Sequence, residues 1–144
     1  MQVATTIPGI TAEAAAQAVQ AAVRYAESHG WKINVAVADR SGNLMAFLRM
    51  PGAFLHSIDL AIDKAYTAAS FGFRTKDWMS IVGGDEGMKL GFSATPRLIV
   101  FGGGLPIRLD GESEWLGGIG VSGASEEQDE ECALAGLVAI GINT

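Results

Sequence analysis

The chain has 144 residues, of which 49% are hydrophobic and 18% charged, with a formal net charge of −6. This length suits one domain with a sizeable core, and the acidic balance argues against a nucleic-acid partner, which requires a basic stripe. The single cysteine, Cys132, excludes an intrachain disulfide and a C-x-x-C metal knuckle. The first residues contain neither a basic leader segment nor a long apolar run, so we expect a cytoplasmic protein with no membrane partner.

Two helices and a hairpin are predicted in the first half of the chain. Thr11 can cap a first helix, in which small apolar residues recur at helical spacing until Gly30 stops it. Residues 33–39 (INVAVAD) and 44–50 (LMAFLRM), joined by the turn SGN, then predict a β-hairpin. A second helix is expected over residues 57–72, where an apolar stripe ends at Gly72.

The second half is predicted to add short helices, three strands and a closing helix. Residues 74–96 suit short helices and an irregular loop, and residues 98–101 (LIVF) suit a strand. The segments LPIRLD and EWLGGIGVSG predict a second hairpin that turns at Asp110-Gly111, and residues 125–141 predict the last helix. Hairpin-connected strands imply an antiparallel sheet flanked by helices, an α/β protein of the α+β kind. No repeat or linker divides residues 1–144 into more than one domain.

Residues 118–123 (GIGVSG) spell G-x-G-x-x-G, the pattern of a dinucleotide-binding turn. Such a turn belongs to a βαβ unit with an acidic residue about 20 positions on, whereas this chain ends with the helix after the motif. That helix begins with Glu126, Glu127 and Asp129, which already satisfy the helix dipole and would repel a phosphate. Ser125 and Gln128 have the spacing of a capping box. We therefore expect no nucleotide, and glycines that let a helix or a ligand lie close to the strand.

Arg49 and Lys64 are the cations with the most suggestive surroundings. Arg49 ends an apolar strand beside a Pro-Gly turn, where it can bind a carboxylate in bidentate fashion or act as a surface or ion-paired arginine. Lys64 has small or apolar helical neighbours and no acid four positions away. It therefore either snorkels along the helix or is partly buried with a lowered pKa. Ser57 lies seven residues earlier on the same helix face, so both side chains can address one pocket.

The histidines and the remaining nucleophiles give weaker signals. His29 stands in the last turn of the first helix, which indicates a cap, and two distant histidines predict no structural metal. His56, near Phe54, is a candidate general base or axial ligand, or else a hydrogen-bonded surface histidine. Ser122 follows a strand but has no G-x-S-x-G elbow, and Cys132 is expected to be buried and inert on the alanine-rich side of the last helix.

The order and spacing of several short motifs resemble the GlcG/HbpS family, also described as a haem-degrading domain (DUF336) and found at the C-terminus of PduO-type proteins. The first family pattern matches at Asp39, Gly42, Arg49, Met50, Gly52 and Ala53. The pattern S-x-x-x-A-x-x-K-A-x-T-A matches residues 57–68, with Lys64 as its lysine. GGGLPI and GGIGVSGASEEQDEECALAG match the later family motifs, so the resemblance covers essentially the whole chain.

The resemblance implies a profilin-like fold with a five-stranded antiparallel sheet and a homo-oligomer. A homo-oligomer also fits the charged fraction of 18%, against roughly 25% for an average soluble domain, because subunit contacts bury surface. Some members of the family bind haem, and PduO-type relatives are linked with haem or corrinoids. Their haem ligands differ from member to member, so none is transferred to a residue of this chain.

Three functions stay open, and the sequence does not decide whether the protein is an enzyme. The first is a small oligomeric protein that binds haem or a related tetrapyrrole, with His56 as axial ligand and Arg49 or Lys64 at the propionates. The second is a cofactor-free isomerase or hydrolase of a small unsaturated carboxylate from aromatic ring cleavage, in which Arg49 binds the carboxylate and Lys64 or His56 moves a proton. The third is a structural subunit without catalysis. In either ligand-binding case we expect further contacts from Phe54, Ser57, Gly103, Pro106 and Ser122.

Overall fold

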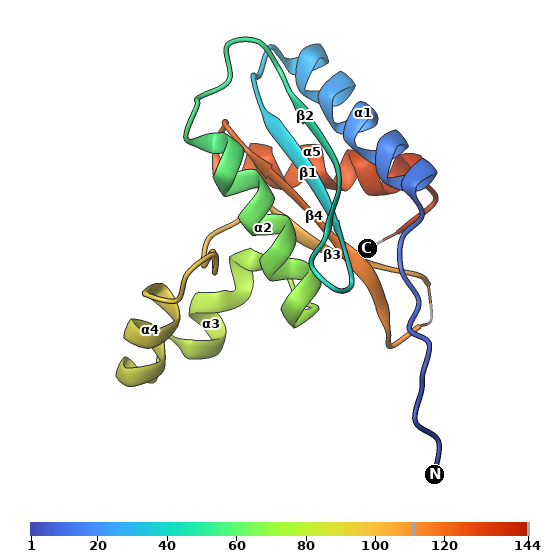
Figure 1. The fold of residues 1–144 in the computed structure, drawn as a ribbon. Coiled ribbons are helices and arrows are strands. Elements are labelled where there is room, and N and C mark those ends of the chain that lie inside the picture. The colour runs from blue at the N-terminus through green and yellow to red at the C-terminus, as the bar shows by residue number, and fades with distance from the viewer. Residues whose placement is uncertain (111, 144) are drawn as a thin grey trace.

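The computed structural model describes residues 1–110 and 112–143. The elements are coloured along the chain in Figure 1. In order they are helix α1 (Ala12–His29), strands β1 (Asn34–Asp39) and β2 (Leu44–Arg49), helix α2 (Ser57–Phe71), the 3-10 turn η1 (Thr75–Asp77), helices α3 (Trp78–Val82) and α4 (Glu86–Ser93), strands β3 (Gly104–Arg108) and β4 (Trp115–Ser122), and helix α5 (Glu126–Ala139). Across these two ranges, no helix has the length and apolar character needed to cross a membrane.

An antiparallel sheet in the order β2-β1-β4-β3 forms the middle layer of the molecule. Helices α1 and α5 cover one face and α2 covers the other, while α3 and α4 project to one side (Figure 1). Strand β1 is buried on both faces because it lies inside the sheet and helices cover each face, and its residues alternate between the two faces. Val35 and Val37 join the larger core under α1 and α5, whereas Ala36 and Ala38 meet the alanines of α2. The predicted α+β arrangement is confirmed.

The helix ends follow the local signals in the sequence. The Thr11 hydroxyl accepts a hydrogen bond from the Ala14 amide at 3.1 Å and caps α1. Gly30 and Gly72, both at φ 76°, end α1 and α2 in the left-handed conformation that glycine adopts without strain. Ser125 and Gln128 form the predicted capping box at the start of α5.

The expectation of a five-stranded sheet is wrong, because the sheet has four strands among the described residues and residues 98–101 are not one of them. This segment is fastened to α2 instead. The buried Thr67 hydroxyl accepts a hydrogen bond from the Ile99 amide at 3.1 Å. Its one proton has two acceptors within reach, the Asp63 carbonyl oxygen of the same helix at 2.7 Å and the Arg97 carbonyl oxygen at 2.9 Å. The Gly102 amide then donates to the Glu126 carboxylate at 2.7 Å. Side chains thus satisfy backbone groups that a neighbouring strand would otherwise have paired.

The other expected elements are present. Both predicted hairpins form, and the irregular stretch holds η1, α3 and α4. Strands β3 and β4 pair on either side of the turn expected at Asp110-Gly111, of which Gly111 lies outside the described residues. A profilin-like arrangement stays a prediction.

The glycines of the G-x-G-x-x-G segment bring α2 directly onto β4. A Cβ atom at Gly118 would lie 2.3 Å from the Ala65 carbonyl oxygen, and one at Gly120 would lie 2.2 Å from the Ala61 carbonyl oxygen. Both neighbours are helix backbone, which cannot rotate away as a side chain can. The prediction that these glycines admit a close neighbour is therefore confirmed, and the neighbour is a helix.

Gly120→Ala is expected to lower the free energy of unfolding by about 2–3 kcal/mol, because α2 would have to move off the sheet. Gly91→Ala in α4 is the matched control, since a Cβ there has no atom within 4 Å. The control should be neutral or stabilising by up to about 1 kcal/mol, as alanine favours a helix. Urea denaturation of both variants measures the difference. Equal stabilities would show that β4 tolerates a side chain under α2.

Candidate functional site

Lys64 lies in the middle of α2, and its side chain is only 1% exposed. Its Nζ donates to the Val121 carbonyl oxygen at 2.8 Å and forms an ion pair with Asp129 Oδ2 at 3.3 Å. Because α2 and α5 lie on opposite faces of the sheet, the lysine reaches past the sheet end to join the two layers. The lysine is therefore buried in an ion pair, the more enclosed of the two settings expected from the sequence.

Glycines provide the space that the lysine side chain occupies. A Cβ at Gly103 would lie 2.6 Å from Lys64 Nζ, and a Cβ at Gly120 would lie 2.8 Å from Lys64 Cβ. Gly103 also has φ 124°, which side-chain-bearing residues rarely adopt. The Phe101 ring lies on another side of the ammonium group, 5.2 Å from Nζ to the ring centroid. Gly103 and Gly104, which come directly before β3 and begin it, thus lie against the lysine with no room for a side chain.

Asp129 is the counter-ion, and its other carboxylate oxygen accepts a hydrogen bond from the Ala124 amide at 2.9 Å. Burial lowers the pKa of Lys64 and raises that of Asp129, while the attraction between the two charges opposes both shifts. In the sequence, Asp129 stands out only as one of the acids that begin α5. It lies 65 residues from Lys64, and the one signal for its role is that it follows the G-V-S-G segment of the family motif.

Three polar residues on neighbouring strands, Arg49, Asn34 and Ser122, form a row across the same end of the sheet. Asn34 is the register partner of Arg49 on β2 and of Ser122 on β4. Paired residues point to one face, and alternation along β1 puts Asn34 on the face that α2 covers. Asn34 is fully buried, and its Oδ1 has no hydrogen-bond partner among the described residues. Sequence analysis missed this residue, whose only signal was a polar side chain at the start of an otherwise apolar strand.

The segment before α2 lies over this row. The Asn34 amide nitrogen donates to the Phe54 carbonyl oxygen at 3.3 Å, and Arg49 Nη2 donates to the Ala53 carbonyl oxygen at 2.9 Å. Arg49 is exposed and makes no ion pair within the described part of the chain. Ser57, the first residue of α2, is buried.

His56 contrasts with the other histidine. Its side chain is exposed and makes no cap at α2, and its ring has no hydrogen bond or ring contact with any residue that the structure describes. Phe54 and Leu55, beside it in the chain, are 70% and 72% exposed. His29, in contrast, lies 3.0 Å from the Tyr25 carbonyl oxygen and stacks on Trp31, so it closes α1 as predicted.

The predicted site residues therefore fall into three groups. Lys64 lies against Gly103, whereas Arg49 and Ser122 share the row that the Phe54–Ser57 segment approaches. Pro106 lies apart from both, on β3 at a pocket with Arg74 and Arg108. The five pockets described on the surface are lined by neither Lys64 nor Arg49. That Arg49 and Lys64 contact one ligand, as the ligand-binding functions above suppose, stays a prediction. Within residues 1–110 and 112–143, no cluster of three His, Cys, Asp or Glu side chains could hold a metal ion.

Known proteins are similar to this chain in sequence and in fold. A family model described as haem-degrading protein HbpS-like matches residues 10–138. This chain belongs to the HbpS-like family. It is 36% identical to an uncharacterized 15.0 kDa protein in the dhaT-dhaS intergenic region of Citrobacter freundii, over 91% of this chain and 92% of that protein.

Solved structures agree with the family assignment. The crystal structure of Klebsiella pneumoniae protein ORFY, of family DUF336, is 32% identical with a TM-score of 0.87, covering 97% of this chain and 96% of that one. The crystal structure of a PduOC:heme complex is 31% identical with a TM-score of 0.84, covering 94% of this chain and 98% of that one. The family resemblance stated from the motifs is confirmed.

Replacing Lys64 tests whether the buried pair holds the layers together. Lys64→Met leaves the Asp129 carboxylate buried without its partner and should lower the free energy of unfolding by about 3–5 kcal/mol. Lys64→Met combined with Asp129→Leu removes both charges and should recover most of that loss. Guanidinium denaturation at pH 7 measures both variants. A single variant as stable as the wild type would contradict the structural role.

The Cys132 thiol should be unreactive in the folded protein. Burial, together with Asp129 and Glu131 nearby, raises its pKa to about 12, so very little thiolate exists at neutral pH. Ellman's reagent is expected to label the protein only after denaturation. Rapid labelling of the native protein would show that α5 opens readily.

Proposed function

We propose that this protein binds haem or a related tetrapyrrole, as a homo-oligomer whose single domain spans residues 1–144. The observation that carries the proposal is His56, an exposed imidazole without a partner among the described residues, next to exposed Phe54 and Leu55. A free imidazole nitrogen can ligate the metal of a tetrapyrrole, and apolar side chains can pack against its ring; this segment offers both. When bound, haem would supply an iron centre for ligand binding or redox chemistry.

Arg49 is the residue that we assign to a propionate. It lies at the same end of the sheet, and its Nη2 bond to the Ala53 carbonyl oxygen ties it to the segment that carries His56. It is exposed and has no competing carboxylate within the described chain. Lys64 is not assigned to a propionate, because Val121 and Asp129 already bind its ammonium group.

A second copy of the chain is expected to complete the site. None of the five described pockets is lined by Phe54, Leu55 or His56, and the largest of them, about 380 Å³, lies at α4. Exposed Phe54 and Leu55 would be buried if another subunit closed over the bound ring. The crystal structure of a PduOC:heme complex, a relative at 31% identity, supports a haem ligand.

A cofactor-free isomerase or hydrolase of a small unsaturated carboxylate stays the alternative. Arg49 and His56 are exposed enough to serve it. Lys64 would first have to leave its ion pair before it could transfer a proton. Turnover of muconate-type dicarboxylates, followed by ultraviolet absorbance and lost in Arg49→Ala, would favour this alternative.

Hemin titration tests the proposal. Micromolar hemin should shift the Soret band on addition of wild-type protein, and His56→Ala should weaken binding at least tenfold. His29→Ala is the matched control, because His29 belongs to α1 rather than to the exposed Phe54–His56 segment, and its loss should leave hemin binding unchanged. Light scattering on the same samples reports the number of subunits. No Soret shift, or equal binding by His56→Ala, would overturn the assignment.

A further inference from the structure

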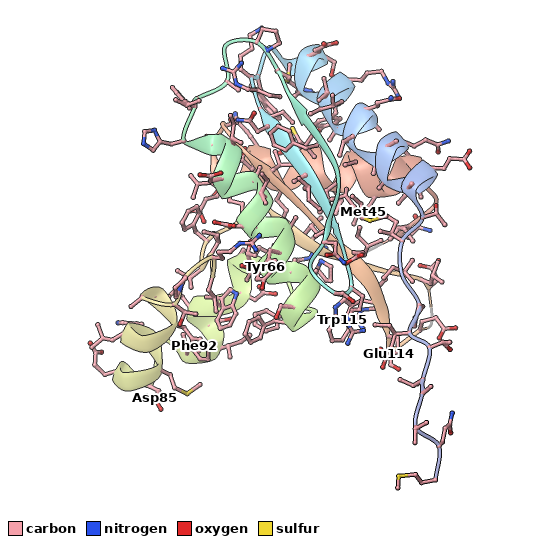
Figure 2. The ribbon with its side chains drawn as sticks, in the orientation of Figure 1. Met45, Tyr66, Asp85, Phe92, Glu114 and Trp115 are labelled. Carbon is pink, nitrogen blue, oxygen red and sulfur yellow. The ribbon has the colours of Figure 1, made fainter. Side chains whose placement is uncertain are left out.

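A separate pocket lies on the side of α2 that faces away from the sheet. It has a volume of about 250 Å³ and lies between α2 and the chain that follows α4. Figure 2 shows Tyr66 and Phe92 on this side of the molecule, where α3 and α4 project. Most of its wall is apolar, formed by Tyr66, Phe71, Phe92, Pro96 and Leu98. Phe71 and Phe92 also pack on the buried Trp78, with ring centroids 4.8 and 5.0 Å away, so this wall is anchored.

Arg97 is the one charged residue among those lining the pocket. Its guanidinium lies 3.7 Å from the centroid of the Tyr66 ring, and its Nε donates to Asp63 Oδ1 at 2.9 Å. Its two terminal nitrogens have no partner among the residues that the structure describes. The stacking and the single Nε bond therefore orient the guanidinium and leave its bidentate edge open.

The backbone holds Arg97 in an unusual conformation. Its φ is 64°, the only positive φ of a non-glycine residue in the described ranges. Left-handed backbone costs a side-chain-bearing residue about 1 kcal/mol or more and persists only where the surroundings impose it. Here the Thr67 hydroxyl lies against the turn: it accepts from the Ile99 amide at 3.1 Å, and its proton is shared between the Asp63 carbonyl oxygen at 2.7 Å and the Arg97 carbonyl oxygen at 2.9 Å. The same contact that removes residues 98–101 from the sheet thus places the guanidinium at the pocket.

We propose that this pocket binds a small aromatic or unsaturated carboxylate, with the carboxylate on the terminal nitrogens of Arg97 and the apolar part against Phe71 and Phe92. Ligand pockets for drug-sized molecules measure roughly 300–1,000 Å³, so about 250 Å³ suits one ring and excludes a tetrapyrrole. Aromatic walls favour an unsaturated ligand through edge-to-face contacts. The site shares no residue with the His56 face, so it stands whether or not the protein binds haem.

Benzoate is the probe for the test, followed by amide chemical shifts in a ¹H–¹⁵N correlation spectrum. Saturable shifts are expected in residues 66–71 and 92–98. Benzamide keeps the ring without the charge, and acetate keeps the charge without the ring. Each should bind at least tenfold more weakly than benzoate. No saturable shift with benzoate, or shifts confined to residues outside the pocket, would overturn the proposal.

Variants separate the guanidinium from general effects of charge. Arg97→Gln should weaken benzoate binding at least tenfold. Arg40→Gln is the matched control, since Arg40 likewise stacks on a ring, 3.6 Å from Trp115, and pairs with Glu114 at 2.8 Å, but lies outside this pocket. Ser70→Trp, at an exposed position on the rim, keeps Arg97 and should block the pocket. Equal affinities of the Arg97 and Arg40 variants, or unchanged binding by Ser70→Trp, would overturn the proposal.

Discussion

The ion pair between Lys64 and Asp129 joins helices that cover opposite faces of the sheet. Two opposite charges that leave water cost several kcal/mol each, and only close pairing with further hydrogen bonds repays that cost. The Val121 carbonyl oxygen and the Ala124 amide supply those bonds. The arrangement requires that no side chain stands at Gly103, directly over the ammonium group. The glycines and the charge pair therefore depend on one another.

This constraint makes the two layers unequal. On one side, valines, isoleucines and leucines fill the space under α1 and α5. On the other side, glycines and alanines let the backbone of α2 lie against β4. The opposite face of α2 is then available for the chain that follows α4 to pack against. Thr67 fastens residues 97–99 along that face, and the pocket at Arg97 results.

The basic side chains of the candidate sites differ in how many of their nitrogen atoms bond to other residues of the chain. Lys64 is enclosed by a carboxylate and a carbonyl oxygen, which suits a structural role. Arg97 uses one nitrogen on Asp63 and leaves two open, and Arg49 spends one nitrogen on a carbonyl oxygen. His56 uses none within the described chain. Open groups on an anchored side chain are what a ligand can use, and Arg97 and Arg49 each combine one anchoring bond with open nitrogens.

Short-range signals in the sequence were sufficient for the helix caps and the hairpins. Each depends on residues a few positions apart, such as Ser125 with Gln128. The spacing of the motifs in the sequence was also enough to identify the family. Only the tertiary structure showed that residues 98–101 lie outside the sheet, where Thr67, some thirty residues away, accepts the hydrogen bond of the Ile99 amide. The partner of Lys64 and the stacking of Arg97 on Tyr66 were hidden for the same reason. A long-range contact forms only when the layers pack, and no local pattern records which side chains then meet.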